Sequence, residues 1–352
     1  MTVSITAWVV RSPSNYNLSN ISGVTWSYGK QNILDDYSGW TATLYGFNPG
    51  SWTTPQIGEQ VGFYLSSGYI APTVYGYVSN VRVRYGLKPA MDTYEITLEG
   101  TFAKAGRIYG SITTTATSTL YMAQSIAALS GGLLYTDNDL SIYGSTTSAQ
   151  TLTGTVNDLA QLFMRTEGGY IMEDNKMRGR NRAVVANNTF TDVPGDGNFK
   201  YEAIDFRSAV DNYSTQVIVQ PTGLAQQSAG TGDYQAIVAT INGSTVDAST
   251  VASFYKTQMD LNQTVPFTIQ TSGAVSAAAP GAMRLAYPVA THESVTVQFR
   301  GSSYVGQIIG ADFDANSTTW SSTFYLTSSL AASFFVLNST TNGILNTNKL
   351  GF

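Results

Sequence analysis

The sequence predicts a mainly β protein built from antiparallel, barrel-like sheets, with two short helices in a middle segment. Three observations support this class. Apolar and polar residues alternate over short runs, most densely between Gly23 and Phe102, which is the pattern of strands with one buried face. Turn residues separate these runs about every 8 to 12 residues, a spacing typical of β-sandwiches and barrels. Aromatic residues make up 12% of the chain, the same share as charged residues, and strands favour aromatic side chains.

The N-terminal part of the chain predicts one small β-barrel. Val3, Ile5, Ala7 and Val9 occur at every second position and supply a first strand. Further strands, separated by turn residues, are expected at 24–28, 40–45, 61–65, 73–85 and 94–98.

Two short helices are expected in the middle segment, and both have recognisable ends. The first begins at Ser118 and ends at the glycine pair 131–132. The second begins at Thr155, which with Asp158 approximates a capping box, and ends at the glycine pair 168–169. A short apolar strand and an Asp-Asn pair follow each helix. This similarity suggests an internal α/β repeat, with coincidence as the alternative.

The chain has one basic cluster, Lys176–Arg182. An anion-binding site and a solvated hairpin arm are both consistent with it. The hairpin arm is favoured, because Glu173 and Asp174 lie next to the cluster and weaken its field.

A second β-rich region begins at Lys200, after a loop at 192–197. Residues 221–233 are rich in Gly, Gln and Ser and are expected to form a mobile loop. Residues 249–259 fit a helix and a strand equally well. Strands are expected at 215–219, 265–269, 286–290, 295–299, 305–309, 320–326 and 334–337.

Charged residues are scarce, at 12% of the chain where about 25% is usual. This deficit predicts a subunit of a permanent assembly, in which neighbouring subunits cover much of the surface. An exported β protein with an uncharged polar surface is the alternative. The net charge of −5 argues against specific nucleic-acid recognition, which needs clustered Lys and Arg. The N-terminus lacks signal-peptide features, and no run of about 18 apolar residues occurs. We therefore expect synthesis in the cytoplasm without membrane insertion.

The residues needed for common catalytic and metal sites are missing, so we predict no catalytic, cofactor-binding or metal-binding residues. The chain has no cysteine and a single histidine, His292, beside Glu293, which excludes His-based zinc sites and Cys nucleophiles. The segment Asp312–Asn316 resembles the start of a calcium loop, but Ser317 and Thr323 stand where that loop needs Gly and Glu. A pair of carboxylates for glycoside hydrolysis stays open, because such a pair is spatial and not sequential.

Exposed aromatic residues would suit a sugar-binding face, and the tryptophans 26, 40, 52 and 320 are the candidates. Trp40 and Trp320 lie in alternating runs, however, and this favours a packing role for both.

Short segments spread in order over nearly the whole chain resemble the minor tail proteins of long-tailed bacteriophages. In the N-terminal barrel these are Gly29–Gln31, Leu34-Asp35, Ala42–Leu44, Ile57–Val61 and Val74–Val78. Further along they are Glu167–Tyr170, Asp174-Asn175, Arg180–Arg182, Val210–Tyr213, Trp320–Leu326, Phe335–Leu337, Gly343–Leu345 and Lys349–Phe352.

The resemblance implies two tube-like antiparallel β-barrel domains joined by a small α+β region with two short helices. The expected domains are residues 1–105, 106–199 and 200–352. The family forms a hub at the tail tip of the virion, usually a ring of three copies, assembled in the host cytoplasm. Its partners are itself, the tail tube, other tail-tip proteins and the tape measure protein, and DNA passes through the ring. Many members of the family continue into a receptor-binding or peptidoglycan-cleaving region, which does not follow Phe352 in this sequence, and we expect no enzyme and no cofactor. A receptor- or carbohydrate-binding module of a virion is the alternative, and a hydrolase is a third.

Overall fold

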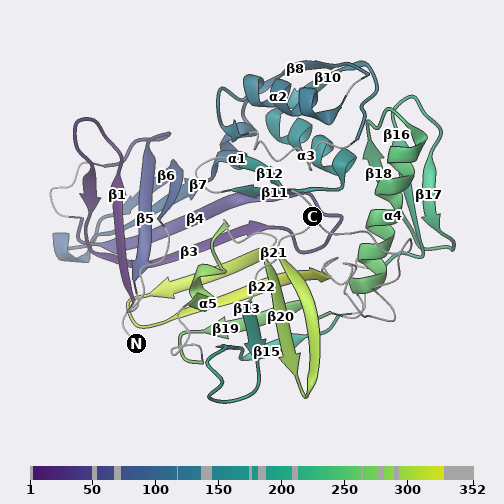
Figure 1. Cartoon of the computed structure of the whole chain (residues 1–352). Helices are drawn as coiled ribbons and strands as arrows, with labels where there is room; N and C mark the ends of the chain where they lie inside the picture. Colours follow the sequence, from purple (N-terminus) through teal and green to yellow (C-terminus); the bar gives the residue numbers. More distant parts are fainter. Residues whose placement is uncertain are drawn as a thin grey trace.

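The computed structural model describes residues 3–49, 54–66, 73–116, 118–135, 145–173, 177–180, 188–207, 213–262, 265–275, 281–288 and 293–328. The predicted mainly β class is confirmed: strands dominate, and the helices cluster beside the sheets (Figure 1). The expected strand at 334–337 lies outside the described residues.

The largest sheet has fourteen strands and draws on both ends of the chain. Its main path runs β14-β13-β20-β21-β3-β4-β7-β6-β5-β1-β2, and β22, β19 and β15 branch from β21. The N-terminal strands are β1 (Ser4–Val9), β2 (Tyr16–Leu18), β3 (Ile21–Gly29), β4 (Ser38–Phe47), β5 (Gln60–Ser66), β6 (Val74–Arg84) and β7 (Thr93–Glu99). The others are β13 (Asn188–Thr191), β14 (Phe199–Lys200), β15 (Ala203–Asp205), β19 (Thr268–Ser272), β20 (Ser294–Phe299), β21 (Ser302–Asn316) and β22 (Trp320–Ser328).

The two expected barrels are joined in this sheet, and among the described residues they do not close. The two parts are joined because β21, with 15 residues, is long enough to pair with strands of both. Its first part pairs with β20, while Gly310–Asn316 pairs antiparallel with Gly23–Gly29 of β3. The path ends at β2 and β14, which do not pair with each other in the described part of the chain. Most ladders are antiparallel as predicted, although β13 pairs in parallel with both β14 and β20.

The seam between β3 and β21 requires glycine on both sides. Gly29 has φ +87°, and a Cβ there would lie 2.2 Å from the carbonyl oxygen of Ile309. A Cβ on Gly310 would lie 2.5 Å from the carbonyl oxygen of Lys30. Both distances are too short for any side chain, so the close approach of the two strands depends on these glycines.

Both predicted middle helices are confirmed as α2 (Thr119–Leu129) and α3 (Val156–Glu167). The Thr155 hydroxyl accepts from the Asp158 amide at 3.2 Å, and the Asp158 carboxylate accepts from the Thr155 amide at 3.1 Å. These bonds complete the predicted capping box, and Gly168 ends the helix in the left-handed conformation.

Helices α2 and α3 and a two-stranded sheet form a core of their own, to which the short helix α1 (Thr101–Ala105) adds Phe102. The sheet consists of β8 (Tyr109–Thr114) and β10 (Gln150–Thr155). A three-stranded sheet contains β9 (Leu134–Tyr135), β11 (Tyr170–Glu173) and β12 (Met177–Arg180), so the strands expected after each helix are present. A short 3-10 helix, η1 (Pro89–Met91), lies between β6 and β7.

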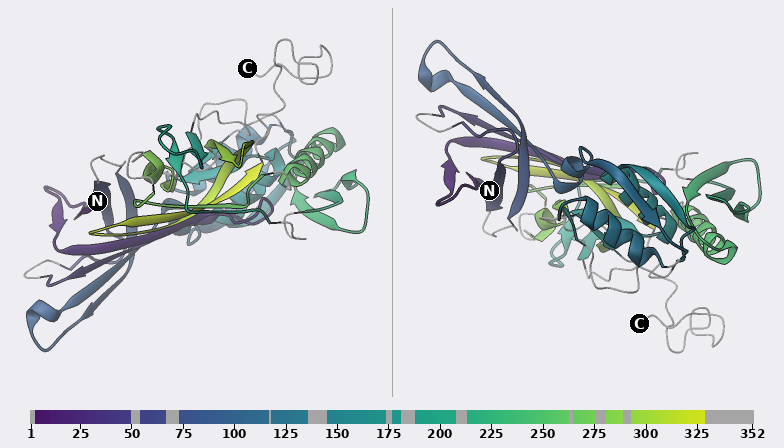
Figure 2. Two further views of the ribbon diagram at one scale, coloured as in Figure 1. Left: turned by 90° about the horizontal axis from the view of Figure 1, so that it is seen from below. Right: turned by 90° about the horizontal axis from the view of Figure 1, so that it is seen from above.

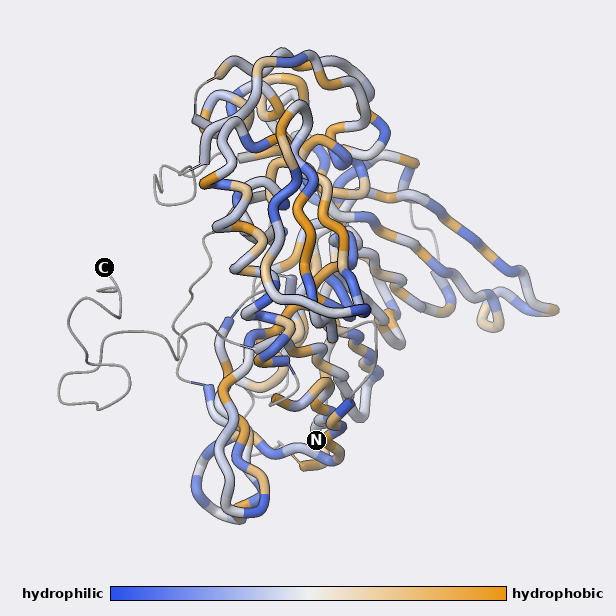
Figure 3. Tube along the Cα trace, turned by 90° about the vertical axis from the view of Figure 1, so that its right-hand side faces the viewer, coloured by the Kyte–Doolittle hydropathy of each residue, from blue (hydrophilic) through white to orange (hydrophobic). Residues whose placement is uncertain are grey.

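Residues 249–259, which fitted a helix and a strand equally, form part of the helix α4 (Thr245–Asn262). Its buried residues Ala248, Val251, Ala252, Tyr255 and Met259 recur at helical spacing. They pack on a small sheet of β16 (Gln216–Pro221), β17 (Gln227–Gly230) and β18 (Gln235–Thr240). Strongly apolar stretches of this sheet face the viewer in Figure 3.

Two expectations for the C-terminal half are wrong. Residues 221–233 are not simply a loop, because β17 lies among them and pairs with β16. Residues 286–288 are not a strand but follow the short helix α5 (Gly281–Arg284) as a turn. The carbonyl oxygens of Leu285 and Ala286 accept side-chain hydrogen bonds from Tyr28 and Trp26, so this segment is held against the sheet face and does not join the sheet as a strand.

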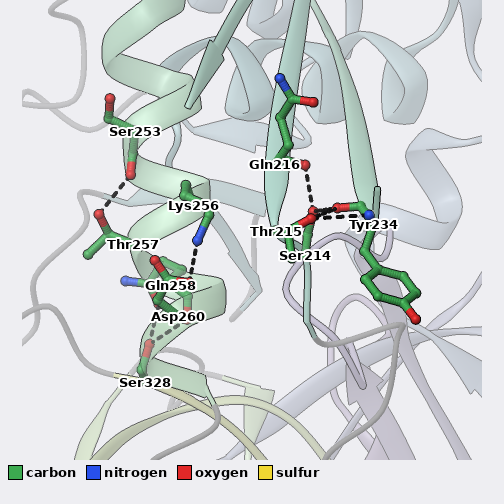
Figure 4. A network of polar contacts seen from close by, with 10 residues as sticks. All are labelled: Ser214, Thr215, Gln216, Tyr234, Ser253, Lys256, Thr257, Gln258, Asp260 and Ser328. Carbon is green, nitrogen blue, oxygen red and sulfur yellow. Dashed lines mark hydrogen bonds and ion pairs between the residues drawn. The ribbon is translucent and has the colours of Figure 1, made fainter. Parts of the chain in front are cut away.

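The end of β22 is tied to α4 through polar side chains (Figure 4). The Ser328 hydroxyl bonds to the Gln258 carbonyl oxygen at 3.1 Å, and the Ser328 amide donates to Asn262 Oδ1 at 2.8 Å. Lys256 and Asp260 form an ion pair within α4 itself. The Ser328 contacts attach the small sheet and its helix to the end of the large sheet.

Candidate functional site

The two faces of the strands β22, β21, β3, β4 and β7 differ sharply in chemistry. Inward-pointing residues are large and buried, among them Trp26, Trp40 and Trp320, which are at most 3% exposed. Residues at the alternate positions are exposed or half-exposed and carry mostly hydroxyl or carboxyl groups. These outward residues, called the outer face below, are Thr25, Ser27, Thr41, Thr43, Tyr45, Thr93, Glu95, Thr97, Asp312, Asp314, Ser321, Thr323 and Tyr325.

The outer face is acidic. The strand registers place Asp312 beside Ser27 and Asp314 beside Thr25, so both carboxylates lie in rows of small polar side chains. None of the outer-face residues is Lys or Arg. Carboxylates and hydroxyls without a cation among them disfavour the binding of phosphate groups.

The strand next to the outer face, β6, carries two arginines, Arg82 and Arg84, in a projecting hairpin. We call residues 80–95, the outer part of β6 and β7 with their connection, the arm. The arm extends beyond the rest of the molecule (Figure 2). Arg82 pairs with Glu95 at 3.8 Å, and both side chains are well exposed, so this ion pair contributes little to stability.

The tip of the arm exposes large apolar side chains. Tyr85 is 83% exposed, Leu87 98% and Met91 60%. The tip is nevertheless well ordered, because the Gly86 amide donates to the Asp92 carboxylate at 2.8 Å and η1 lies beside it. Apolar residues on a folded, projecting element mark a contact surface.

A pocket of about 280 Å³ lies at the opposite end of the strands, beside the turn between β3 and β4. Asp35, Asp36 and Asp312 line it together with one cation, Lys30. The Lys30 ammonium donates to the Ile33 carbonyl oxygen at 3.2 Å. Burial, and then the nearby Arg165, lower the pKa of Lys30 to about 8. Lys30 also lines an adjacent pocket of about 250 Å³ with apolar walls that include Ile33 and Met164.

The most perturbed carboxyl group belongs to Glu173, which is 1% exposed. Its Oε2 accepts from the Trp40 amide at 2.7 Å and the Tyr37 hydroxyl at 3.3 Å. Its Oε1 accepts from the Phe102 amide at 2.5 Å and the Thr101 hydroxyl at 3.3 Å. Burial raises the pKa of Glu173 to about 7, and these hydrogen bonds oppose the shift. Since its own chain encloses the group, Glu173 acts as a clamp between β4, α1 and β11 and not as a catalytic acid.

The structure places several residues that the sequence singled out. Trp26, Trp40 and Trp320 are buried in the main core, which agrees with a packing role. Asp312 and Asp314 lie within β21 and not in a calcium loop. Among the described residues, no group of three or more His, Cys, Asp or Glu side chains is arranged to hold a metal ion. Trp52, His292 and the side chains of the basic cluster lie outside the described residues.

Sequence reasoning missed the arm tip, the acidic pocket and Glu173. The sequence does contain a signal for the arm tip, because Tyr85 and Leu87 are large apolar residues on either side of the turn residue Gly86. It contains no signal for the pocket or for the Glu173 clamp, since each combines residues from segments far apart in the chain.

The continuous antiparallel sheet with its attached helices is the fold of phage tail proteins, and the predicted resemblance is confirmed at the level of the fold. The tail protein from Neisseria meningitidis MC58 is similar, with a TM-score of 0.61, 12% identity and coverage of 93% of this chain and 97% of that one. The 43 kDa tail protein of prophage MuSo2 from Shewanella oneidensis matches with a TM-score of 0.60, 11% identity and coverage of 92% and 97%. No protein-family model and no curated protein sequence matches the chain.

No helix in the part of the chain that the structure describes has both the length and the apolar character needed to span a membrane.

Proposed function

We propose that the chain is a structural, non-enzymatic subunit of a phage tail tip, and that its copies form the hub ring through which DNA passes. The outer face of the continuous sheet is the observation that carries this proposal. A wall of hydroxyl and carboxyl groups without cations lets a polyanion pass, whereas a basic wall would retain it. The proposed homotrimer would bring three such sheets around one axis, and the tail tube, the tape measure protein and other tail-tip proteins are the proposed partners.

The three expected segments have distinct roles in this proposal. Residues 1–105 and 200–352 supply the strands of the channel wall, and the β3–β21 seam makes the wall continuous within one copy. Residues 106–199 contribute α2 and α3, whose apolar residues form most of a second core. Assembly in the host cytoplasm and a final place in the virion follow from this role. A carbohydrate-binding role is less favoured, because Trp26, Trp40 and Trp320 are buried.

The ring is tested by the native mass of the purified chain. We expect a trimer of the 37.7 kDa subunit, measured by native mass spectrometry and by sedimentation velocity across a range of concentrations. Closed rings of this kind are cyclic assemblies with a defined copy number. A protein that stays monomeric at micromolar concentration, or that forms open chains of rising mass, would contradict the proposal.

The channel wall is tested by reversing its charge. We expect the assembled double variant Thr43→Lys/Asp314→Lys, at two outer-face positions, to bind duplex DNA at low salt and to release it as salt rises, because new phosphate contacts displace counterions. The wild-type assembly should not bind under the same conditions. The matched control is Asp260→Lys, an exposed position on α4 outside the outer face. Equal DNA binding by the control and the double variant would contradict the assignment of the outer face to the channel.

A further inference from the structure

The arm tip and the pocket at the β3–β4 turn are complementary, and we propose that the arm of one copy binds in this pocket of a second copy. This inference deepens the proposed function and rests on it, because it requires copies to be neighbours. It assigns a surface and a partner to each end of the sheet.

The first step is that the tip needs a partner. Leu87 is 98% exposed and Tyr85 83%, and an ordered hairpin gains nothing from holding such side chains in water. The Met91 amide donates to the Lys88 carbonyl oxygen at 2.8 Å, so the turn at the tip is already folded. A pre-formed tip loses little conformational entropy on binding, which favours association.

The arm and the pocket carry opposite charge. The arm holds Arg82, Arg84 and Lys88, with Glu95 and Asp92 as its acids. Arg82 is paired with Glu95 and Asp92 binds the Gly86 amide, which leaves Arg84 and Lys88 without an ion pair in the described part of the chain. In the pocket, Asp36 is paired with Arg165, which leaves the Asp35 and Asp312 carboxylates against the single ammonium group of Lys30. A basic tip on a chain with net charge −5 therefore fits the acidic surface of another copy.

The third step is the chemistry of the pocket walls. Tyr325 lines the pocket beside the carboxylates. The Tyr325 hydroxyl donates to Asp312 Oδ2 at 2.7 Å. An aromatic ring next to carboxylates suits apolar and cationic side chains that arrive together, as Leu87 and Lys88 would.

The fourth step excludes contact of the arm with its own pocket. The register pairs Phe47 with Thr93 at the arm end of the sheet and Thr41 with Glu99 towards the other end. Ser38, which lines the pocket, begins β4, so the length of β4 separates the arm from the pocket, a distance on the order of 30 Å. In Figure 2 the arm points away from the rest of the sheet. The contact must therefore be heterologous, between different surfaces of two copies. Such contacts close into a ring when the rotation between neighbouring copies is a whole fraction of a turn.

Site-directed cross-linking tests the contact, and the chain has no native cysteine to interfere. We expect Leu87→Cys and Ser38→Cys, mixed as separate single variants, to form a disulfide between copies under mild oxidation. The double variant should give covalently closed rings on a denaturing gel. The matched control pairs Leu87→Cys with Thr151→Cys, which like Ser38 is an exposed residue but lies on β10, and should not cross-link above background.

A charge exchange gives a second readout that does not need cysteine. We expect Lys88→Glu to weaken assembly about tenfold, and adding Asp35→Lys to restore most of the loss. The concentration at which the assembly dissociates, from sedimentation or mass photometry, is the quantity to compare.

The two proposals fail differently. If the wild-type chain is a ring but the Leu87→Cys and Ser38→Cys variants do not cross-link and Lys88→Glu assembles normally, the arm contact is wrong and the hub survives. If the wild-type chain is monomeric in every assay, the hub and the arm contact fail together.

Discussion

Replacing Glu173 with alanine is expected to lower the free energy of unfolding by about 3–5 kcal/mol. The variant leaves the Trp40 and Phe102 amides and the Tyr37 and Thr101 hydroxyls without their acceptor. Unlike hydroxyls, backbone amides cannot rotate towards another partner, and water has little access to a residue that is 1% exposed. The packing is also specific to this side chain, since a Cβ on Gly100 would lie 2.6 Å from Glu173 Oε1. Urea denaturation followed by circular dichroism measures the loss.

The same residue makes stability depend on pH. Burial raises the pKa of Glu173 from 4.5 to about 7 in the folded chain. Between these values the folded protein holds a proton that the unfolded chain has released, so the Glu173 contribution is complete below about pH 4.5. It is lost as pH rises towards 7, by about 3 kcal/mol in total.

Glu173→Gln is the control for this pH dependence, because the amide does not titrate. We compare the unfolding free energies of wild type and Glu173→Gln at pH 4.5 and at pH 7.5. Relative to the variant, the wild type should lose about 3 kcal/mol of stability between these two pH values. Other groups titrate equally in both proteins and cancel. A difference that stays constant over this range would contradict the raised pKa, and a Glu173→Ala variant as stable as wild type would contradict the clamp.

The local features of the fold were predictable because they depend on neighbouring residues. The capping box at Thr155 and Asp158, the glycine that ends α3 and the alternation in β3 and β4 are all set within a few positions. Residues 249–259 fitted two elements because Phe254 and Tyr255 favour strands, while the helical recurrence of Ala248, Val251 and Ala252 was decided by packing on the small sheet.

The features that were missed depend on contacts between distant segments. β21 pairs with β3 at a separation of more than 280 positions, as Gly310 opposite Gly29 illustrates. No turn or period in either segment records such a pairing. The same holds for Glu173, whose donors lie 71 to 136 positions away in the sequence. Residues 286–288 were expected to be a strand because their composition is apolar. Their buried position comes instead from a contact with a distant segment, the hydrogen bond between Trp26 and the Ala286 carbonyl oxygen.

Replacing Trp26 with alanine is expected to destabilise the protein by about 3–5 kcal/mol, because it removes the aromatic centre of the seam. The Trp26 ring stacks on Phe313 of β21 with centroids 3.9 Å apart and packs against Tyr287 at 5.0 Å. Its Nε1 donates to the Ala286 carbonyl oxygen at 2.7 Å. The substitution therefore creates a cavity and leaves a buried acceptor unpaired. Trp26→Phe keeps most of the ring and should cost less, since it loses the N–H group and only part of the contact area.

Because Trp26 belongs to the N-terminal half and Phe313 to the C-terminal half, this variant also tests whether the two halves fold together. The core that the two halves share in the large sheet predicts that they unfold in one cooperative transition, which Trp26→Ala shifts as a whole to lower denaturant concentration. Tyr121→Ala, at a position on α2 that is 58% exposed, is the control and should change the unfolding free energy by no more than about 0.5 kcal/mol. If Trp26→Ala instead splits the transition and lowers only its first part, the N-terminal barrel is an independent unit. The β3–β21 seam would then join two separately stable domains. The strands of the channel wall would be paired across the seam, but the two domains would unfold independently.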